Sequence, residues 1–242
     1  MIRNNKNMNR INLPQLVIVI VILALGVTYE SLAAHSTHTG AWQTEIVSIE
    51  NRYNGRYPEG LVVFTGSSSI AAWKTLAGDM DPLAVLNHGF SGAKVSDVTR
   101  YADRIIAPFK PKAVVLFAGT NDINGIPGKS HSADQVVRDV IALFDQVRSR
   151  LPSVPIYYIS ITPTELRWHV WPEAQQANAR IQAYCRKHES LHFIDITPNL
   201  LNENGAPDTL LYKPDRLHPN KRGYEIWTSV IKPVLLRDLG PN

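Results

Sequence analysis

The sequence contains a single cysteine, Cys185, among 242 residues. One thiol cannot form an internal disulfide, so a hydrophobic core has to hold the fold together. The neighbours of Cys185 offer no partner that would activate a thiol, and we expect a small buried apolar residue on a helix. Internal repeats and low-complexity tracts are also missing, and 44% hydrophobic with 19% charged residues is ordinary globular composition. These features predict one folded domain, spanning residues 41–242.

A basic face is missing as well. The formal charge is +4, and Arg3, Lys6 and Arg10 contribute to it from the first ten residues. Without residues 1–33, the sequence has 22 basic and 20 acidic residues, which is nearly balanced. Proteins that bind nucleic acid carry a basic stripe on the folded domain itself. The sequence therefore argues against a nucleic-acid partner.

The N-terminus has the pattern of an export signal. The basic start precedes an apolar run over residues 16–27, and the small residues Ser31, Ala33 and Ala34 follow. This order predicts a signal peptide over residues 1–33, cleaved near Ala33, and a linker over 34–40. The alternative is an uncleaved anchor, in which residues 11–29 associate with the membrane. Either way the basic start stays in the cytoplasm, so we expect an extracytoplasmic, periplasmic domain.

Apolar runs and helical periodicity alternate along the rest of the chain. Runs rich in β-branched and aromatic residues predict parallel strands covered on both faces, at 61–64, 84–86, 113–117, 156–159 and 191–194. Helical spacing of apolar residues predicts helices at 133–150, 174–188 and 224–236, with a first helix within 41–54. The alternation predicts a three-layer α/β/α sandwich with a five-stranded parallel sheet.

Unusual polar residues follow the predicted strands. Because functional groups collect beyond the carboxyl ends of parallel strands, these segments are candidates for a site. They are Gly66-Ser67-Ser68-Ser69, Asn87-His88-Gly89-Phe90-Ser91-Gly92, Gly119-Thr120-Asn121-Asp122 and, before the last helix, Asp215-Arg216-Leu217-His218-Pro219-Asn220.

These four blocks, in this order, resemble those of the SGNH hydrolase (GDSL-like lipase/esterase) family over residues 60–236. The resemblance implies a flavodoxin-like SGNH fold, with Ser68 as the nucleophile and the pair Asp215 and His218 as its acid and base. It also implies an oxyanion hole formed by Ser68, Gly92 and Asn121.

The chemistry of these residue types supports the same roles. A serine hydroxyl needs a base to take its proton, and histidine suits that task near neutral pH. A carboxylate on the other ring nitrogen fixes the tautomer, and backbone or amide N–H groups stabilise the oxyanion of the tetrahedral intermediate. Each residue also has an ordinary structural reading, since Ser68 could cap a helix and Asn121 could form a turn.

Two positions depart from the family pattern. Ser67 stands where the family has aspartate, which concerns the geometry of the loop, and Arg216 stands where glycine is frequent, which concerns access to His218. The sequence shows no suitably spaced second histidine or carboxylate beside Asp215 and His218, so we expect no metal and no cofactor.

The resemblance implies a serine esterase that hydrolyses carboxylic esters through an acyl-enzyme on Ser68. Its substrates would be short-chain acyl or acetyl esters, lysophospholipids or acylated glycans, and we expect Trp168, His169 and Trp171 to form one wall of the substrate pocket. The alternative is a non-catalytic carbohydrate-binding or scaffold protein on the same fold, because a fold alone does not fix a function.

Overall fold

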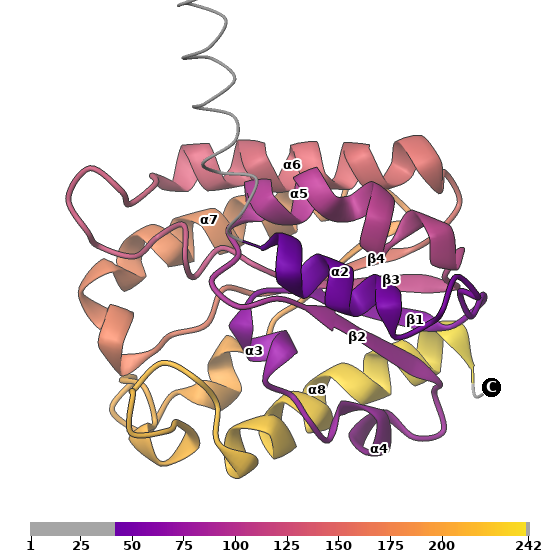
Figure 1. Cartoon of the computed structure of the whole chain (residues 1–242). Coiled ribbons are helices and arrows are strands. Elements are labelled where there is room, and N and C mark those ends of the chain that lie inside the picture. The colour runs from indigo at the N-terminus through magenta and orange to yellow at the C-terminus, as the bar shows by residue number, and fades with distance from the viewer. Residues whose placement is uncertain (1–41, 241–242) are drawn as a thin grey trace, which may run out of the picture. The chain divides into compact units, whose positions relative to one another are not determined.

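The computed structural model describes residues 42–240, in which five parallel strands form one sheet in the order β2-β1-β3-β4-β5 (Figure 1). The predicted signal or anchor and the predicted linker lie outside these residues. Within 42–240, no helix combines the length and apolar character that crossing a bilayer requires. The strands are β1 (Val62–Gly66), β2 (Val85–Gly89), β3 (Ala113–Phe117), β4 (Ile156–Ile159) and β5 (Leu191–Ile194).

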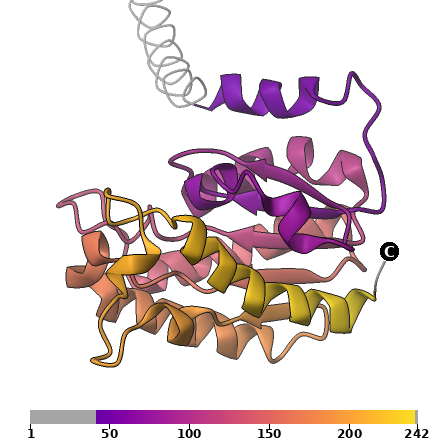
Figure 2. The ribbon, with the colours of Figure 1, turned by 90° about the horizontal axis from the view of Figure 1, so that it is seen from below.

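Helices cover both faces of the sheet, which confirms the three-layer α/β/α prediction. On one face α5 packs on α6 and α6 on α7, and on the other α4 packs on α8. Figure 2 shows α8 crossing in front of the sheet. The helices are α2 (Gln43–Asn51), α3 (Ser68–Ala71), α4 (Leu76–Met80), α5 (Val95–Ile105), α6 (Ala133–Arg150), α7 (Trp171–Cys185) and α8 (Lys221–Leu239). Short 3-10 helices are η1 (Ala107–Phe109), η2 (Glu165–Val170), η3 (Thr197–Leu200) and η4 (Thr209–Leu211).

The predicted helices differ from the observed ones mainly at their ends. Helix α6 has the predicted bounds, and its N-cap Ser132 accepts a hydrogen bond from the Gln135 backbone. Helix α7 begins three residues earlier than predicted, because Pro172 fits the first helical turn, where its missing N–H is not needed. Helix α8 begins at Lys221, directly after Asn220, whose side chain accepts from the Gly223 N–H.

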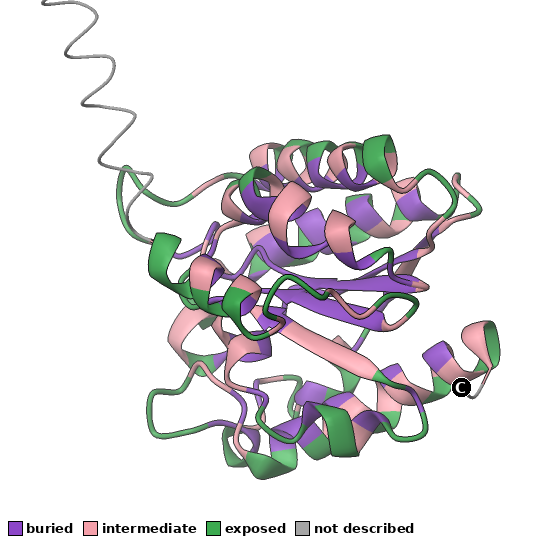
Figure 3. Ribbon diagram, turned by 45° about the vertical axis from the view of Figure 1, so that its right-hand side comes forward, coloured by how far each residue is buried: buried purple, intermediate pink, exposed green. Residues whose placement is uncertain are grey.

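Helix α5 was not predicted, although its buried residues Val95, Val98, Ala102 and Ile105 follow helical spacing. The two edge strands, β2 and β5, contain half-buried residues, whereas β1, β3 and β4 between them are fully buried (Figure 3).

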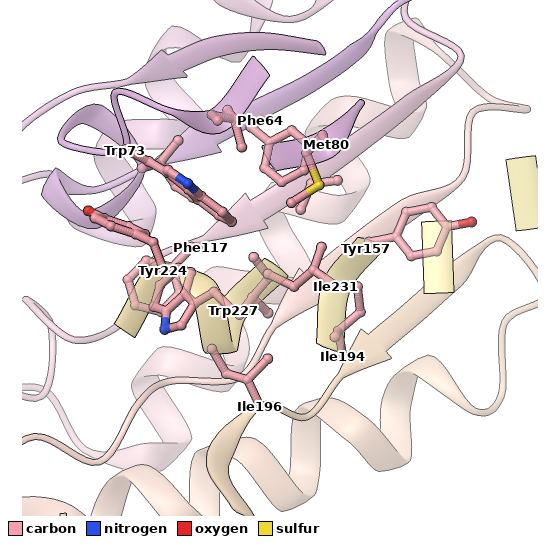
Figure 4. Packing of buried hydrophobic residues seen from close by; sticks show 14 of the residues in the cluster. Phe64, Trp73, Met80, Phe117, Tyr157, Ile194, Ile196, Tyr224, Trp227 and Ile231 are labelled. Carbon is pink, nitrogen blue, oxygen red and sulfur yellow. The ribbon is translucent and has the colours of Figure 1, made fainter. Parts of the chain in front are cut away.

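A buried hydrophobic cluster lies between the sheet and α8. Figure 4 shows Trp73 beside Tyr224, and Phe117 beside Trp227. The rings of Trp73 and Tyr224 stack with centroids 5.0 Å apart, and those of Phe117 and Trp227 meet edge-on at 4.8 Å. This packing fastens the last helix of the chain to the segment that follows β1, because Trp73 comes shortly after α3.

The turn out of β1 depends on a close approach between two backbones. Gly66 has a φ of +136°, and a Cβ atom there would lie 1.9 Å from the carbonyl oxygen of Phe117. The next N–H, that of Ser67, donates to the same oxygen at 2.9 Å. Only glycine therefore lets the chain pass β3 at this distance and enter α3.

We expect Gly66→Ala to lower the free energy of unfolding by about 3 kcal/mol or more, because the new methyl adds a backbone clash to an unfavourable φ. Gly60→Ala is the matched control, since Gly60 has a φ of +75° with nothing within 4 Å of the position of its Cβ. Its expected loss is only about 1 kcal/mol, from φ alone. Urea unfolding of both variants measures the two losses of free energy. Equal losses would show that the close approach of Gly66 to Phe117 does not contribute to stability.

Candidate active site

Of the three adjacent serines after β1, Ser68 is the one whose side chain is not buried. Ser67 occupies the N-cap position of α3 without a side-chain capping bond, and Ser68 is the first helical residue. Ser67 and Ser69 are buried, with 2% and 7% of their surface exposed, while Ser68 is half-buried. A substrate can therefore reach the Ser68 hydroxyl and not its neighbours.

A chain of two hydrogen bonds links Ser68 to Asp215 through His218. The Ser68 Oγ lies 2.7 Å from His218 Nε2, and His218 Nδ1 lies 2.8 Å from Asp215 Oδ2. A carboxylate only accepts hydrogen bonds, so the imidazole proton belongs on Nδ1. This tautomer leaves the Nε2 lone pair free to take the serine proton.

Asp215 is held as a charged acceptor. Its Oδ1 accepts from the backbone N–H groups of Leu217 at 3.0 Å and His218 at 2.9 Å. Partial burial raises the pKa of Asp215, but these two N–H groups and the His218 imidazole outweigh it and lower the pKa to about 2. Asp215 therefore remains ionised throughout the neutral range.

Backbone contacts fix the loop that carries the acid and the base. Tyr212 and Pro219 form an isolated antiparallel bridge, and the Lys213 N–H donates to the His218 carbonyl at 2.8 Å. At the start of α8, the Tyr224 hydroxyl donates to the Ser69 carbonyl at 2.8 Å. That bond connects α8, which directly follows the loop of His218, to α3, which carries Ser68.

The three residues that the family resemblance assigns to the oxyanion hole, Ser68, Gly92 and Asn121, each keep an N–H that could donate to an oxyanion. Within the described residues, the backbone N–H groups of Ser68 and Gly92 donate to no protein acceptor. Asn121 Nδ2 donates to the Ala93 carbonyl at 2.9 Å, which leaves its second hydrogen available. Gly92 has a φ of +76°, a conformation that favours glycine. The oxyanion hole formed by these three residues stays a prediction, and each of them retains the donor that it requires.

Arg216 occupies a backbone conformation that explains the frequent glycine of the family pattern. Its φ is +58°, in the left-handed region, and its N–H donates to the Lys213 carbonyl at 2.8 Å. Its carbonyl accepts from Leu166, and its guanidinium lies 3.2 Å from a Glu165 carboxylate oxygen. Arg216 thus fastens η2 to the loop of the catalytic pair.

The three predicted pocket residues lie in different environments. His169 lines a cavity of about 520 Å³, whereas Trp168 and Trp171 do not. Trp168 is 36% exposed and stacks on Trp171, which is 6% exposed, with ring centroids 6.1 Å apart. Trp171 starts α7 and is buried beneath Trp168. That all three residues form one wall of the substrate pocket stays a prediction.

Most of the cavity lining escaped the sequence analysis. It comes from the loop after Asn121 and from the start of α7, and a Gly-Pro-Gly cluster at 125–128 was the available signal for an exposed loop. The lining residues are Ile123, Gly125, Ile126, Pro127, Gly128, Ser130, His131, Ser132, His169, Val170, Pro172 and Glu173.

One cluster of potential metal ligands lies outside the Ser68 chain. Among the described residues, ligand atoms of Asp122, His131 and Asp139 all fall within 4.8 Å of one another. Cys185 does not contribute a nucleophile, since it is buried and burial raises the pKa of its thiol to about 12.

Comparison with known proteins bears on the family of the chain. A family model described as the GDSL-like Lipase/Acylhydrolase family matches residues 48–226. No curated protein sequence matches the chain.

Solved structures share the fold at low sequence identity. A protein from Streptococcus pneumonia is 19% identical at a TM-score of 0.68, over 84% of this chain and 99% of its own. A GDSL-like lipase from Bacteroides thetaiotaomicron is 23% identical at a TM-score of 0.62, and the match covers 74% of this chain and 88% of the lipase. A carbohydrate esterase family 3 protein from Talaromyces cellulolyticus is 19% identical at a TM-score of 0.56, and the match covers 74% of this chain and 97% of that protein. These likenesses establish the fold.

We expect Ser68→Ala to fold normally yet lose activity on aryl esters by a factor on the order of 10³ or more, because it removes the nucleophile. Ser67→Ala and Ser69→Ala are the matched controls and should retain activity within about tenfold, because each loses at most a local contact. Mass spectrometry after labelling with a fluorophosphonate should place the adduct on Ser68. An adduct on Ser67 or Ser69 would mean that the nucleophile is assigned one residue away from its true position.

Proposed function

Because this chain belongs to the GDSL-like lipase/acylhydrolase family and is a carboxylic ester hydrolase, we propose that it acts through an acyl-enzyme on Ser68. The observation that carries the proposal is the continuous chain of hydrogen bonds from Ser68 Oγ through His218 to Asp215. A non-catalytic scaffold would not need a serine, a base and an oxyanion hole aligned in this way.

The reaction proceeds in two halves. In the first, Ser68 Oγ attacks the ester carbonyl carbon while His218 Nε2 takes the hydroxyl proton, and the oxyanion accepts hydrogen bonds from Ser68, Gly92 and Asn121. The tetrahedral intermediate collapses, the ester C–O bond breaks, and the leaving alcohol takes the proton from His218. In the second half, a water molecule gives its proton to His218, attacks the acyl-enzyme and releases the acid, and the proton returns to Ser68.

We propose short-chain acyl esters of neutral, hydroxylated carriers, such as acylated glycans, as the substrates. The cavity next to the Asn121 loop supports this class. It is lined by serine hydroxyls, two imidazoles, a carboxylate and apolar side chains, and no lysine or arginine is among its lining residues. Such a lining suits sugar hydroxyls and ring faces better than the phosphate of a lysophospholipid. The likeness to a carbohydrate esterase family 3 protein points the same way.

A substrate panel tests this choice. We expect a higher kcat/KM on an acetylated oligosaccharide than on a lysophosphatidylcholine. His169→Ala should raise KM for the acetylated oligosaccharide and leave phenyl acetate hydrolysis within about twofold, because only the larger substrate reaches the cavity. His188→Ala, a change three residues after the end of α7, is the control. Preference for the phospholipid, or a His169→Ala effect on both substrates alike, would contradict the proposed carrier.

We further propose that the enzyme acts outside the cytoplasm, either soluble after cleavage near Ala33 or held to the inner membrane by residues 11–29. The support is the basic, apolar and small-residue order of the first 34 residues. Cell fractionation should recover the activity from the periplasm or the membrane, and N-terminal sequencing of the product distinguishes the two. Full-length protein in the cytosol would refute both forms.

A further inference from the structure

The short helix η2 lies between the loop that follows β3 and the loop that carries His218. On the side of the base, the Leu166 N–H donates to the Arg216 carbonyl at 3.1 Å. On the other side, the Arg167 guanidinium donates through Nη1 to the Asn124 carbonyl at 2.6 Å. All three segments lie where the strands end, toward the left of Figure 1. Helix η2 therefore bridges the two loops.

Asn124 passes this contact on to Asn121, the predicted side-chain donor of the oxyanion hole. The Asn124 side chain donates through Nδ2 to the Asn121 carbonyl at 2.8 Å, and its Oδ1 accepts from the Ile126 N–H at 2.8 Å. Asn124 is 8% exposed, so the surrounding protein restricts its movement. A displacement of the Asn124 backbone would therefore displace Asn121 as well.

Backbone contacts fix the point from which Arg167 reaches Asn124. Thr164 is the N-cap of η2, and its hydroxyl and carbonyl accept from the Arg167 N–H at 3.3 and 3.1 Å. His169 packs closely on the same loop, because a Cβ atom at Gly125 would lie 2.1 Å from His169 Nε2. The reach of the Arg167 side chain thus sets the distance between η2 and the loop after β3.

The environment of Arg167 is unfavourable for a charge. Arg167 is half-buried, and this burial lowers the pKa of its guanidinium. Within residues 42–240, its buried Nε has no hydrogen-bond partner and its guanidinium forms no ion pair with a carboxylate. Removing a charged group from water without a counter-charge costs free energy. An apolar side chain of similar length would fill the same space without that cost.

We propose that Arg167 is a positioning residue of the esterase: its guanidinium holds the Asn124 carbonyl and thereby fixes Asn121 relative to the loop of His218. The proposal rests on the proposed function of Ser68 and its oxyanion hole. An oxyanion donor has to lie at hydrogen-bond distance from the oxygen of the tetrahedral intermediate, and a displacement of about 1 Å can cost about 100-fold in rate. Arg167 therefore contributes to kcat and little to stability.

Two substitutions separate this role from a merely structural one. Arg167→Met removes the donors and the charge but keeps an apolar stem of similar length. It should lower kcat for phenyl acetate by about tenfold with KM within about twofold, because the oxyanion forms only in the transition state. The urea unfolding midpoint should change little, since removal of the half-buried charge offsets the lost hydrogen bond. Arg167→Lys should restore most of the kcat, because an ammonium N–H can replace the single N–H that Asn124 accepts.

A double-mutant cycle tests whether Arg167 acts through Asn121. Asn121→Ala should lower kcat by about 100-fold or more, because it removes an oxyanion donor. In that background Arg167→Met should lower kcat by about twofold at most, because the side chain that it positions is gone. Arg150→Met is the matched control and should leave kcat unchanged. Arg150 ends α6, at the opposite edge of the sheet, and pairs with Asp103 on the surface.

Three results would overturn the proposal: independent effects of Arg167→Met and Asn121→Ala on kcat, no rescue by Arg167→Lys, or a loss of stability with unchanged kcat. A rise in KM alone would mean that Arg167 contacts the substrate, and would overturn it too. The fluorophosphonate adduct and Ser68→Ala report separately on the acyl-enzyme. Full activity of Asn121→Ala beside an inactive Ser68→Ala would therefore refute the role of Arg167 and leave the acyl-enzyme standing.

Discussion

The hydrogen bond between Ser68 and His218 joins two residues that lie 150 positions apart in the chain. Neither side chain is useful without the other, because a serine hydroxyl is a weak nucleophile until a base accepts its proton. The parallel sheet solves the problem of bringing them together. Every strand ends at the same edge, so the turn after β1 and the loop before α8 meet there, on the left of Figure 1. The stacking of Trp73 on Tyr224 and the hydrogen bond from the Tyr224 hydroxyl to the Ser69 carbonyl then hold α8 against the segment that carries Ser68.

Two aspartates near this edge show how environment divides one residue type between two tasks. Asp215 is well exposed, and two backbone N–H groups and an imidazole keep it charged at any physiological pH. Asp122 is fully buried, and its charge is close to balance near neutrality. The first can serve as a constant partner for the base. The second has no such constant charge, because burial opposes its ionisation.

The sequence predicted the sheet well, because runs such as residues 113–117 are too apolar and too β-branched for anything but a covered strand. It also predicted Ser68, Asp215 and His218 as one group, although by resemblance, since spacing alone cannot choose among three adjacent serines. The structure supplies the physical reason: Ser67 and Ser69 are buried. The environment of Trp171 and the lining of the cavity could not be predicted, because both depend on how η2 folds against the loop after Asn121. Arg216 was noticed as unusual, and only its backbone angle shows why glycine is frequent there.

The position of the base has a consequence for truncated variants. His218 lies after β5, and the helix that secures its loop, α8, spans Lys221–Leu239. A variant cut before Lys221 keeps Ser68 and His218 but loses the hydrogen bond from the Tyr224 hydroxyl to the Ser69 carbonyl. Such a variant carries a nucleophile without a secured base.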